Sequence, residues 1–231
     1  MMHCLFHPKI NRSNLEYYFE GDELKHLKAL RLGIGEMIMI TNGQGFSLKA
    51  KIMSLRNNSL LIENPEFFEN YGELDCRVCV GMAILENRDR MEFALEKCVE
   101  LGAKEFFPLI TKNCEKRNIN LDRLRAKSLA AMKQCRRSEL IKISSPVDIS
   151  ELQKRFQNFD TIFLADINGE IYDKRFRSGR NLILVGPEGG FTEQEINFIK
   201  KNPKTKSINL GPRRLRAETA VIVMMTLLSI E

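Results

Sequence analysis

One run of residues constrains the fold of this chain more than any other. Leu182–Val185 is a stretch of four apolar residues that leads directly into Gly-Pro-Glu-Gly-Gly at 186–190. Such an apolar run suits a strand that is buried on both faces of a sheet. Thr192 and Glu195 follow with the spacing of a capping box, which predicts the start of a helix. A strand, a glycine-rich turn and a helix in direct succession are typical of ligand sites in α/β proteins.

A second turn of the same kind follows at 208–220, where a short apolar run leads into Gly211-Pro212 and then into a predicted helix. Either turn alone would pass as a tight turn without a ligand, but the arginines at 213, 214 and 216 favour a binding site. Two such turns at neighbouring strand ends would expose main-chain amides and carbonyls to a flat heterocycle. The chain contains neither G-x-x-x-x-G-K-[ST] nor G-x-G-x-x-G after a strand, so a phosphate-binding loop of those types is not indicated.

Together with residues 98–103, these two turns closely resemble the bacterial 16S ribosomal RNA uridine N3-methyltransferases, the RsmE family of the SPOUT superfamily. The family patterns L-V-G-P-E-G-G-[FW]-[ST]-x-x-E and L-G-P-R-I-L-R-x-E-T-A match the chain except at Arg214, where an apolar residue is usual. The resemblance covers nearly the whole chain. It implies S-adenosylmethionine as the cofactor, 16S ribosomal RNA or the small ribosomal subunit as the partner, and a homodimer.

The pattern of strands and helices predicts an α/β domain with a mainly parallel sheet over residues 73–231. Strands are expected at 78–85, 106–110 and 161–166, and helices from Asp89, ending before Gly102, and over 121–135. The resemblance alone implies that this is a SPOUT domain with a C-terminal trefoil knot. The last helix is apolar on every side, as expected if the fold or a partner buries it.

Residues 1–70 are expected to form a small β-rich domain, and the resemblance implies a PUA-like RNA-binding barrel. Runs at 36–41 and 46–52, separated by Asn-Gly-Gln-Gly, predict a hairpin, and residues 22–31 have helical spacing. Residues 64–72 contain Pro, Gly and acidic residues, and we expect a linker there.

The net charge of +6 is unevenly distributed along the chain. Residues 1–72 contain eight basic and eight acidic residues, so the remaining 28 basic and 22 acidic residues carry the whole excess. Within 112–142, ten basic and three acidic residues give a local net charge of +7. This density is consistent with binding to a polyanion such as RNA, and equally with a solvated helix face.

The six cysteines show no regular spacing, which favours reduced thiols in a cytoplasmic protein. Cys76 and Cys79 lack the further cysteine or histidine that a metal site needs, so no metal is expected. The N-terminus has no long apolar segment typical of a signal peptide, and the apolar run at 220–230 is too short to span a bilayer.

By resemblance, three loops line the cofactor pocket. The residues concerned are Leu164, Ala165, Leu184, Gly186, Glu188, Gly189, Gly190, Leu210, Gly211, Pro212 and Leu215.

Methylation at N3 of uridine requires loss of a weakly acidic imide proton and alignment of the nitrogen with the methyl group. Arg213 and Arg216 match the family motif, and a guanidinium there would orient the base and stabilise developing negative charge. Glu218 is the third candidate catalytic residue. It either accepts the N3 proton, with a pKa raised by burial, or forms a buried ion pair with an arginine.

The candidate RNA contacts are His26, Arg31, Arg90, Gln134 and Arg137. His26 equally suits a structural role, since one histidine without partners proves little. The chain has Asn-Arg-Asp-Arg at 87–90 where the family has K-G-D-R, and Lys-Gln-Cys-Arg-Arg at 133–137 where the family has E-Q-[SC]-[GN]-R. These departures allow a SPOUT methyltransferase with a different RNA target. A noncatalytic RNA-binding assembly factor is the second alternative, and the presence of both glycine turns with Arg213, Arg216 and Glu218 argues against it.

Overall fold

The computed structural model describes residues 2–56, 58–173 and 178–230 and divides the chain into two compact units. One unit contains Met1–Glu73 and Leu129–Leu140, and the other contains Leu74–Ser128 and Ile141–Glu231. The division predicted from the sequence, 1–70 and 73–231, stays a prediction about independently folding domains. No helix in the described part of the chain is long and apolar enough to cross a membrane.

The first unit is built on a five-stranded sheet in the order β1-β3-β4-β5-β2, with β1 and β2 at its edges. Its elements are β1 (His3–Phe6), β2 (Glu16–Tyr18), α1 (Gly21–Ala29), β3 (Met37–Thr41), β4 (Phe46–Arg56) and β5 (Ser59–Glu69). β1 and β3 pair in parallel, and the other pairs are antiparallel. The strand order is open, so the hydrogen bonds between the described strands form a half-barrel rather than a closed ring.

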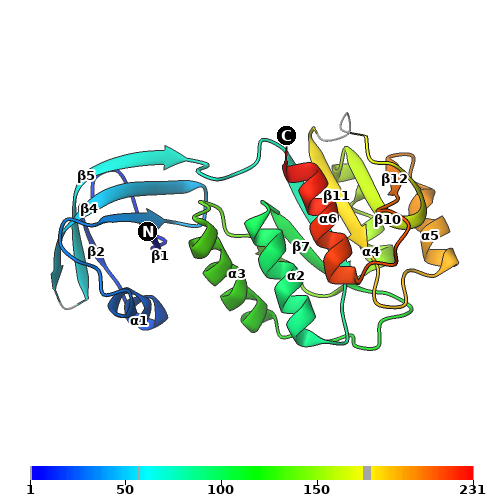
Figure 1. Cartoon of the computed structure of the whole chain (residues 1–231), viewed down its shortest axis with the longest axis horizontal. Coiled ribbons are helices and arrows are strands. Elements are labelled where there is room, and N and C mark those ends of the chain that lie inside the picture. The colour runs from blue at the N-terminus through cyan, green and yellow to red at the C-terminus, as the bar shows by residue number, and fades with distance from the viewer. Residues whose placement is uncertain (1, 57, 174–177, 231) are drawn as a thin grey trace. The chain divides into compact units, whose positions relative to one another are not determined.

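The hairpin predicted from the sequence is confirmed, since β3 and β4 pair antiparallel from Met37↔Lys51 to Thr41↔Ser47. The linker predicted at 64–72 is wrong for residues 64–69, because residues up to Glu69 belong to β5 (Figure 1). The β4–β5 register shifts between Lys49 and Lys51, opposite the Asn64-Pro65 pair, and Asn64 has a φ of 49°. Pro and a left-handed residue are compatible with a strand at such an irregularity, and there they resemble a linker in sequence.

Main-chain hydrogen bonds attach Leu129–Leu140 to the hairpin of the first unit. The Ser138 carbonyl accepts from Gly45 N at 2.9 Å and from Thr41 Oγ1 at 3.1 Å, and Leu140 N donates to the Gly43 carbonyl at 2.8 Å. The helix α3 (Leu121–Cys135) therefore contributes residues to both units. Its bounds agree with the helix predicted at 121–135.

The second unit contains a seven-stranded sheet with the order β12-β10-β11-β6-β7-β8, and β9 pairs with β7. Every pair is parallel. The prediction of an α/β domain with a parallel sheet is therefore confirmed. The elements are β6 (Arg77–Ala83), α2 (Arg88–Glu100), β7 (Glu105–Ile110), β8 (Lys142–Ile143), β9 (Val147–Asp148), α4 (Ile149–Gln153), η1 (Phe156–Asn158), β10 (Thr161–Glu170), β11 (Arg180–Val185), α5 (Glu193–Lys200), β12 (Thr205–Ile208) and α6 (Ala217–Ser229).

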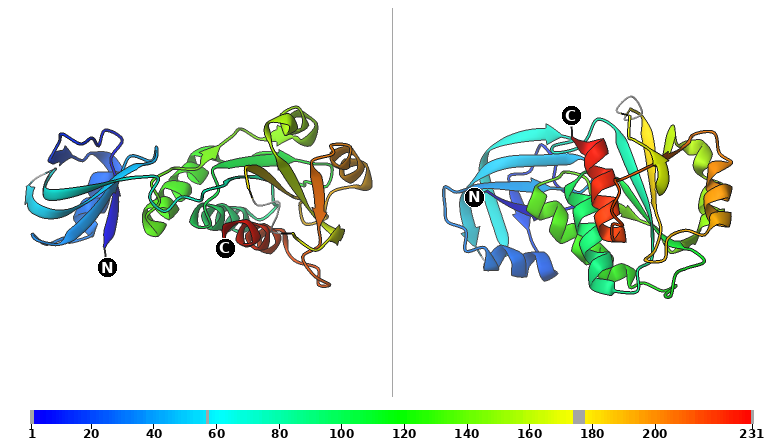
Figure 2. Two further views of the ribbon diagram at one scale, coloured as in Figure 1. Left: turned by 90° about the horizontal axis from the view of Figure 1, so that it is seen from above. Right: turned by 45° about the vertical axis from the view of Figure 1, so that its right-hand side comes forward.

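Helices cover both faces of this sheet (Figure 2). α2 and α6 pack against each other on one face, where α6 contacts β11 and β6. On the other face, Leu152, Phe156 and Ile199 pack in one core cluster with Leu182 and Leu184 of β11. Leu182–Val185 are all buried, as the apolar run predicts for a strand covered on both faces.

The helix ends follow the local sequence with one difference. Thr192 and Glu195 form the predicted capping box at the start of α5. Gly102 has a φ of 94° and follows the C-cap of α2, as expected of a C′ glycine. The cap of α2 is Asn87 and not Asp89, because the Asn87 side chain accepts a hydrogen bond from Arg90 N at 3.1 Å.

Candidate functional site

Three chain segments meet at the carboxyl ends of β10, β11 and β12. β10 lies between the other two strands, so the segments that follow all three are neighbours. The β10–β12 pairing is interrupted between Ala165 and Glu170. Asn209 bridges this interruption, since its amide N donates to the Glu170 carbonyl at 2.8 Å and its Nδ2 donates to the Ile167 carbonyl at 2.7 Å. Parallel sheets commonly bind ligands at this edge.

The turn at 186–190 is compact because its residues lack side chains where the main chain folds back. A Cβ on Gly186 would lie 2.8 Å from Phe191 N and 3.0 Å from the Gly190 carbonyl carbon, so a larger residue would displace the turn. Gly190 has a φ of 72°, a conformation that suits glycine. Asn113 Nδ2 donates to the Gly190 carbonyl at 3.0 Å and holds the turn from outside.

Two adjoining cavities, of about 400 Å³ and 620 Å³, open between these segments. Each has a size typical of sites for small molecules. Of the residues predicted to bind the cofactor, eight line one or both: Ala165, Gly186, Glu188, Gly189, Gly190, Leu210, Gly211 and Leu215. The structure thus brings the three predicted loops together at one site.

The other three predicted cofactor residues do not line these cavities. Leu164 and Leu184 are fully buried neighbours in the β10–β11 pairing, and their side chains belong to the core under the site. Pro212 is exposed. Any contact of Leu164 or Leu184 with a ligand would therefore involve the main chain.

Several lining residues were not predicted as site residues. These are Asn87, Asp166, Ile167, Pro187, Phe191, Arg214 and Ala220, together with strand and helix ends at Val185, Ile208 and Ala217. Arg214 is the residue at which the chain departs from the family pattern. Its Nη2 donates to the Glu188 carbonyl at 3.0 Å and so links the two glycine turns. The family pattern has an apolar residue at position 214, so it could not indicate that an arginine there would contact the other glycine turn.

Arg90 and Glu218 form a two-pronged ion pair beside the larger cavity. Arg90 Nε donates to Glu218 Oε1 at 2.8 Å, and Arg90 Nη2 donates to Glu218 Oε2 at 2.6 Å. Arg90 Nη1 also donates to Glu188 Oε1 at 3.2 Å. The guanidinium therefore joins the first turns of α2 and α6 to the glycine turn, and much of its donor capacity is used within the site. Glu218 forms the ion pair that was one of its two sequence interpretations.

The environment of Glu218 favours its ionised form. Burial, the largest contribution, raises the pKa of the carboxyl, but hydrogen bonds from Arg90 and from its own amide, and the nearby Arg216, outweigh it and lower the pKa below its ordinary value. The expectation that burial alone would raise the pKa is therefore wrong. Glu218 also lies in the first turn of α6, where a negative charge is favourable to the helix dipole.

Arg213 and Arg216 present free guanidinium groups at the site. Arg213 lines the smaller cavity and Arg216 the larger one, and both residues are exposed. Among residues 2–56, 58–173 and 178–230, neither side chain forms a hydrogen bond or an ion pair. Unpaired cations at the mouth of a cavity suit an anionic or electron-rich ligand.

Four of the predicted RNA contacts, His26, Arg31, Gln134 and Arg137, belong to the first unit and differ in exposure. Arg31 and Gln134 are exposed. His26 is partly buried, with Nδ1 3.0 Å from Lys133 Nζ and 3.4 Å from Glu23 Oε1. His26 therefore has partners of its own, which fits the structural role considered for it.

The prediction that Arg137 contacts RNA does not fit its position. The Arg137 side chain is only 2% exposed, and Nη2 donates to Glu73 Oε2 at 2.7 Å in an ion pair that is buried on both sides. Glu73 Oε1 also accepts from the main-chain amides of Ser138 and Glu139 at 3.1 Å and 2.9 Å. The long side chain of an arginine in a basic run indicates a surface contact, but here a carboxylate far away in sequence binds it in the interior.

Within the described ranges, no group of three or more His, Cys, Asp or Glu side chains is placed to hold a metal ion. The site presents main-chain groups, apolar side chains, four arginines (Arg90, Arg213, Arg214 and Arg216) and three carboxylates (Asp166, Glu188 and Glu218).

Comparison with known proteins identifies the family. The RNA methyltransferase domain family matches residues 72–229, which is most of the chain and includes all three loops. A ribosomal RNA small subunit methyltransferase E from Mesomycoplasma hyopneumoniae is 30% identical over 212 residues, covering 88% of this chain and 89% of that protein. This chain belongs to the ribosomal RNA small subunit methyltransferase E family. Members of this family are RNA-modifying enzymes, and the match extends over both units.

Other relatives agree with this assignment. The methyltransferase E of Rickettsia conorii is 29% identical over 199 residues, covering 84% of this chain and 80% of that protein. The crystal structure of a ribosomal RNA small subunit methyltransferase E from Neisseria gonorrhoeae superimposes with a TM-score of 0.86 at 26% identity, covering 98% of this chain and 96% of that one. That structure contains bound S-adenosyl methionine.

Proposed function

We propose that this chain is an S-adenosylmethionine-dependent methyltransferase that methylates N3 of a uridine in 16S ribosomal RNA of the small ribosomal subunit. The observation that carries this proposal is that residues 165–167 of β10 and the segments after β11 and β12 line adjoining cavities. Arg213 and Arg216 also line them, and neither forms an ion pair in the described residues. The Neisseria gonorrhoeae relative, which has the same fold over its whole length, binds this cofactor. The relatives' names supply the class of RNA.

The residues at the site fit the cofactor. Among the described residues, a Cβ on Gly190 or Gly211 would meet no atom within 4 Å beyond its chain neighbours, so a ligand can approach the main chain of both turns closely. Leu210 and Leu215 supply apolar surface on the opposite side of the cavities. S-adenosylmethionine supplies a methyl group already activated on a sulfonium centre. The protein therefore has to bind the cofactor, align its methyl group with N3 of the uridine and exclude water. The three loops form the walls of the site in which this would occur.

Arg213 and Arg216 act on the uracil ring in this proposal. Removal of the N3 proton leaves negative charge that spreads to the neighbouring carbonyl oxygens, and a guanidinium beside them stabilises it. Both side chains are exposed, and neither forms an ion pair with a carboxylate in the described residues, so both are available for this contact. Arginine itself stays protonated, so it does not act as the base.

Glu218 is assigned a positioning role rather than that of the proton acceptor. Its lowered pKa makes it a weak base, and Arg90 occupies both of its oxygens. An ionised carboxylate in this place holds Arg90, which in turn holds Glu188 of the glycine turn. Loss of Glu218 would therefore disturb the geometry of the cofactor site first.

A homodimer is part of the proposal. Ile222, Val223 and Leu227 of α6 are apolar residues that remain partly exposed, and Phe93 on the adjacent α2 is 44% exposed. A second copy that covers these side chains would bury apolar surface that water now contacts. Sedimentation of the purified chain tests this point, and a monomer at micromolar concentration contradicts it.

The proposal includes two further features of the fold, a PUA-like barrel in the first unit and a trefoil knot in the second. The chain leaves the edge strand β12 and returns past β10 so that α6 packs on β11 and β6, which is the kind of path that a knot requires. A crystal structure in which the path of the main chain forms no knot would contradict the proposed trefoil knot.

All six cysteines are free thiols, which supports a reducing compartment such as the cytoplasm.

Calorimetry with S-adenosylmethionine tests the proposed function. The wild-type chain is expected to bind the cofactor saturably. Gly189→Trp is expected to abolish binding because a side chain there meets Asn113, which holds the turn, and the large ring displaces the main chain that lines the cavity. Lys201→Ala, an exposed change at the end of α5, serves as the control and should bind normally. A folded wild-type protein that binds no cofactor, with or without small-subunit RNA, would indicate the noncatalytic assembly factor instead.

A further inference from the structure

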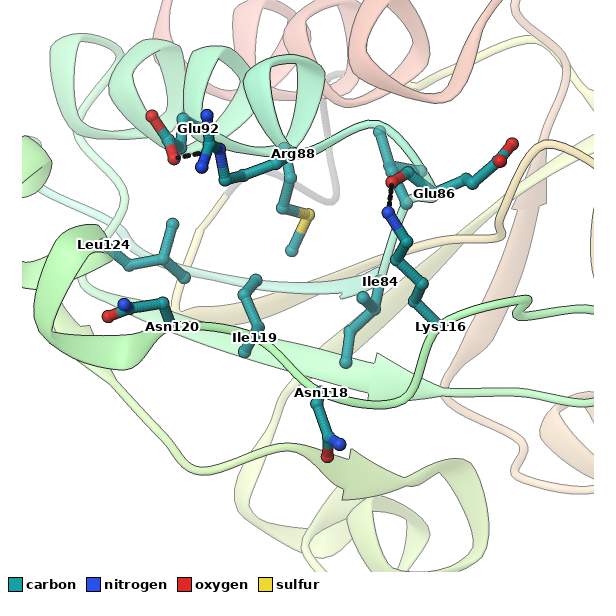
Figure 3. Close-up of a pocket in the computed structure, with 11 residues that line it drawn as sticks. Ile84, Glu86, Arg88, Glu92, Lys116, Asn118, Ile119, Asn120 and Leu124 are labelled. Atoms are coloured by element: carbon teal, nitrogen blue, oxygen red, sulfur yellow. Dashed lines mark hydrogen bonds and ion pairs between the residues drawn. The ribbon is translucent and has the colours of Figure 1, made fainter.

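A separate hollow of about 180 Å³ lies in the second unit between the end of β6, the start of α2 and the segment that leads into α3. Figure 3 shows Ile84, Ile119 and Leu124 gathered between α2 and this segment. Met91 of α2 adds a fourth apolar side chain to the wall. The hollow is smaller than the ~300–1,000 Å³ typical of sites for drug-sized ligands, so it suits a single ring rather than a whole cofactor.

Two cations lie at the rim of the hollow, Arg88 on one side and Lys116 on the other (Figure 3). Lys116 Nζ donates to the Glu86 carbonyl at 2.7 Å, which fixes the ammonium group without neutralising it. In the described part of the chain, no carboxylate lies within ion-pair distance of Lys116. The rim therefore carries a positioned positive charge that is available to a ligand.

The buried carboxylate beside the hollow lies among three cations. Glu92 is about 5% exposed at its side chain and lies 3.5 Å from Arg88 Nε, 3.0 Å from Arg123 Nη2 and 3.9 Å from Lys127 Nζ. Asp89 and Glu96 pair in turn with two of these cations, Arg88 and Lys127, so the charges around Glu92 balance. Within the described residues, the rim cation without a carboxylate partner is Lys116. Glu92 also orders the Arg88 side chain, which lowers the entropy cost of binding an anion there.

The hollow is continuous with the cofactor site. Asn87 borders the larger cavity at the glycine turns and also a wide depression that Glu86, Arg88 and Lys116 border. The same Glu86, Arg88 and Lys116 line the hollow. A chain molecule that enters the cofactor site can therefore reach the hollow along one uninterrupted surface within the same unit.

We propose that this hollow binds a nucleotide that flanks the target uridine in the RNA substrate. Its base lies against the partly exposed Ile119, above the buried Ile84 and Leu124 at the bottom of the hollow, and its phosphate contacts Arg88 and Lys116. Single-stranded RNA is recognised by bases that leave the stack and lie on apolar surfaces, while cations bind the phosphates. This inference rests on the proposed function, and it adds to that function a subsite outside the cofactor-binding loops.

Kinetics with small-subunit ribosomal RNA tests the subsite. Ile119→Ala removes apolar wall, Lys116→Ala removes the rim charge, and Arg117→Ala is a matched control because Arg117 is the exposed neighbour that does not line the hollow. We expect each subsite variant to raise KM for the RNA by about tenfold with kcat within about twofold, the pattern of a lost binding contact. Cofactor affinity by calorimetry and thermal melting should stay unchanged. Arg117→Ala should retain the wild-type KM.

Cross-linking separates this inference from the proposed function. Small-subunit RNA that contains 4-thiouridine is irradiated with the wild-type protein, and the peptides attached to RNA are identified by mass spectrometry. Cross-links within 116–124 support the subsite. Wild-type KM values for both subsite variants, or losses no larger than that of Arg117→Ala, overturn it. If the wild type transfers no methyl group, the proposed function fails, and filter binding of the same RNA still decides: equal affinities of Ile119→Ala, Lys116→Ala and wild type overturn the subsite.

Discussion

Arg90 and Glu218 are 128 positions apart in sequence and yet meet in a bidentate ion pair, at 2.8 Å and 2.6 Å. Arg90 is in the first turn of α2 and Glu218 is in the first turn of α6. The third donor group of the guanidinium reaches Glu188 in the glycine turn. One arginine therefore fixes the relative positions of two helices and one loop of the cofactor site.

A double-mutant cycle measures this coupling. We expect Arg90→Met and Glu218→Gln each to lower the free energy of unfolding, because each leaves a partly buried charge or dipole without its partner. The double variant should lose less than the sum of the two, with a coupling free energy of about 1–3 kcal/mol. Chemical denaturation of the four proteins provides the values. Additive losses would show that the pair contributes nothing as a pair.

The stabilisation by Glu218 should depend on pH in a defined direction. The pKa of Glu218 in the folded protein lies below its ordinary value of 4.5. A carboxyl with a lowered folded pKa contributes stability that is present above the unfolded pKa and is lost as the pH falls through the folded pKa. The difference in Tm between wild type and Glu218→Gln should therefore be largest near pH 6 and shrink below about pH 4. A difference that grows as the pH falls would contradict this sign.

Arg213 and Arg216 should affect methyl transfer more than cofactor binding. We expect Arg213→Gln and Arg216→Gln to lower kcat by about 10²–10³-fold, the range seen when a group that stabilises developing charge is removed. Cofactor affinity should change less than about threefold, since main-chain groups and apolar side chains form the pocket. Lys201→Gln, remote from the cavities, is the control for loss of a surface charge. Equal losses in cofactor affinity and rate would assign these arginines to the cofactor instead.

Arg137 should act on stability and not on RNA affinity. Arg137→Ala removes the guanidinium partner of the buried Glu73 carboxylate, for which we expect a loss of about 3–5 kcal/mol in the free energy of unfolding. The exposed neighbour Arg136 is a matched control, and Arg136→Ala should melt as the wild type does. An Arg137→Ala protein with unchanged melting and weakened RNA binding would restore the original prediction of an RNA contact.

Local signals in the sequence predicted much of the fold. The capping box of Thr192 and Glu195 depends on residues three positions apart, and the buried strand at 182–185 follows from four consecutive apolar residues. Both features depend only on residues that are close in sequence, so they can be predicted without the tertiary structure. The two glycine turns could be located for the same reason, because each directly follows a strand. Leu164 and Ala165 were assigned only by resemblance to the family, and they lie within β10.

Contacts between distant segments could not be predicted in this way. Nothing near Arg90 or Arg137 in the sequence indicates that Glu218 or Glu73 will bind the guanidinium group. The cap of α2 shows a milder case, since Asn87 and Asp89 are both good N-cap residues and only the geometry selects Asn87. The Asn64-Pro65 pair likewise resembles a linker until its partner strand β4 is known.

Nucleoside analysis after methyl transfer tests the central claim most directly. Small-subunit ribosomal RNA, free or in the assembled subunit, is incubated with the wild-type protein and isotopically labelled S-adenosylmethionine, then digested and analysed by mass spectrometry. The account predicts label in 3-methyluridine at a single position, and its loss with Gly189→Trp. Label in another nucleoside would contradict the assignment of N3 and leave a methyltransferase with a different target, and no label from a protein that binds the cofactor and the RNA would contradict the enzyme itself.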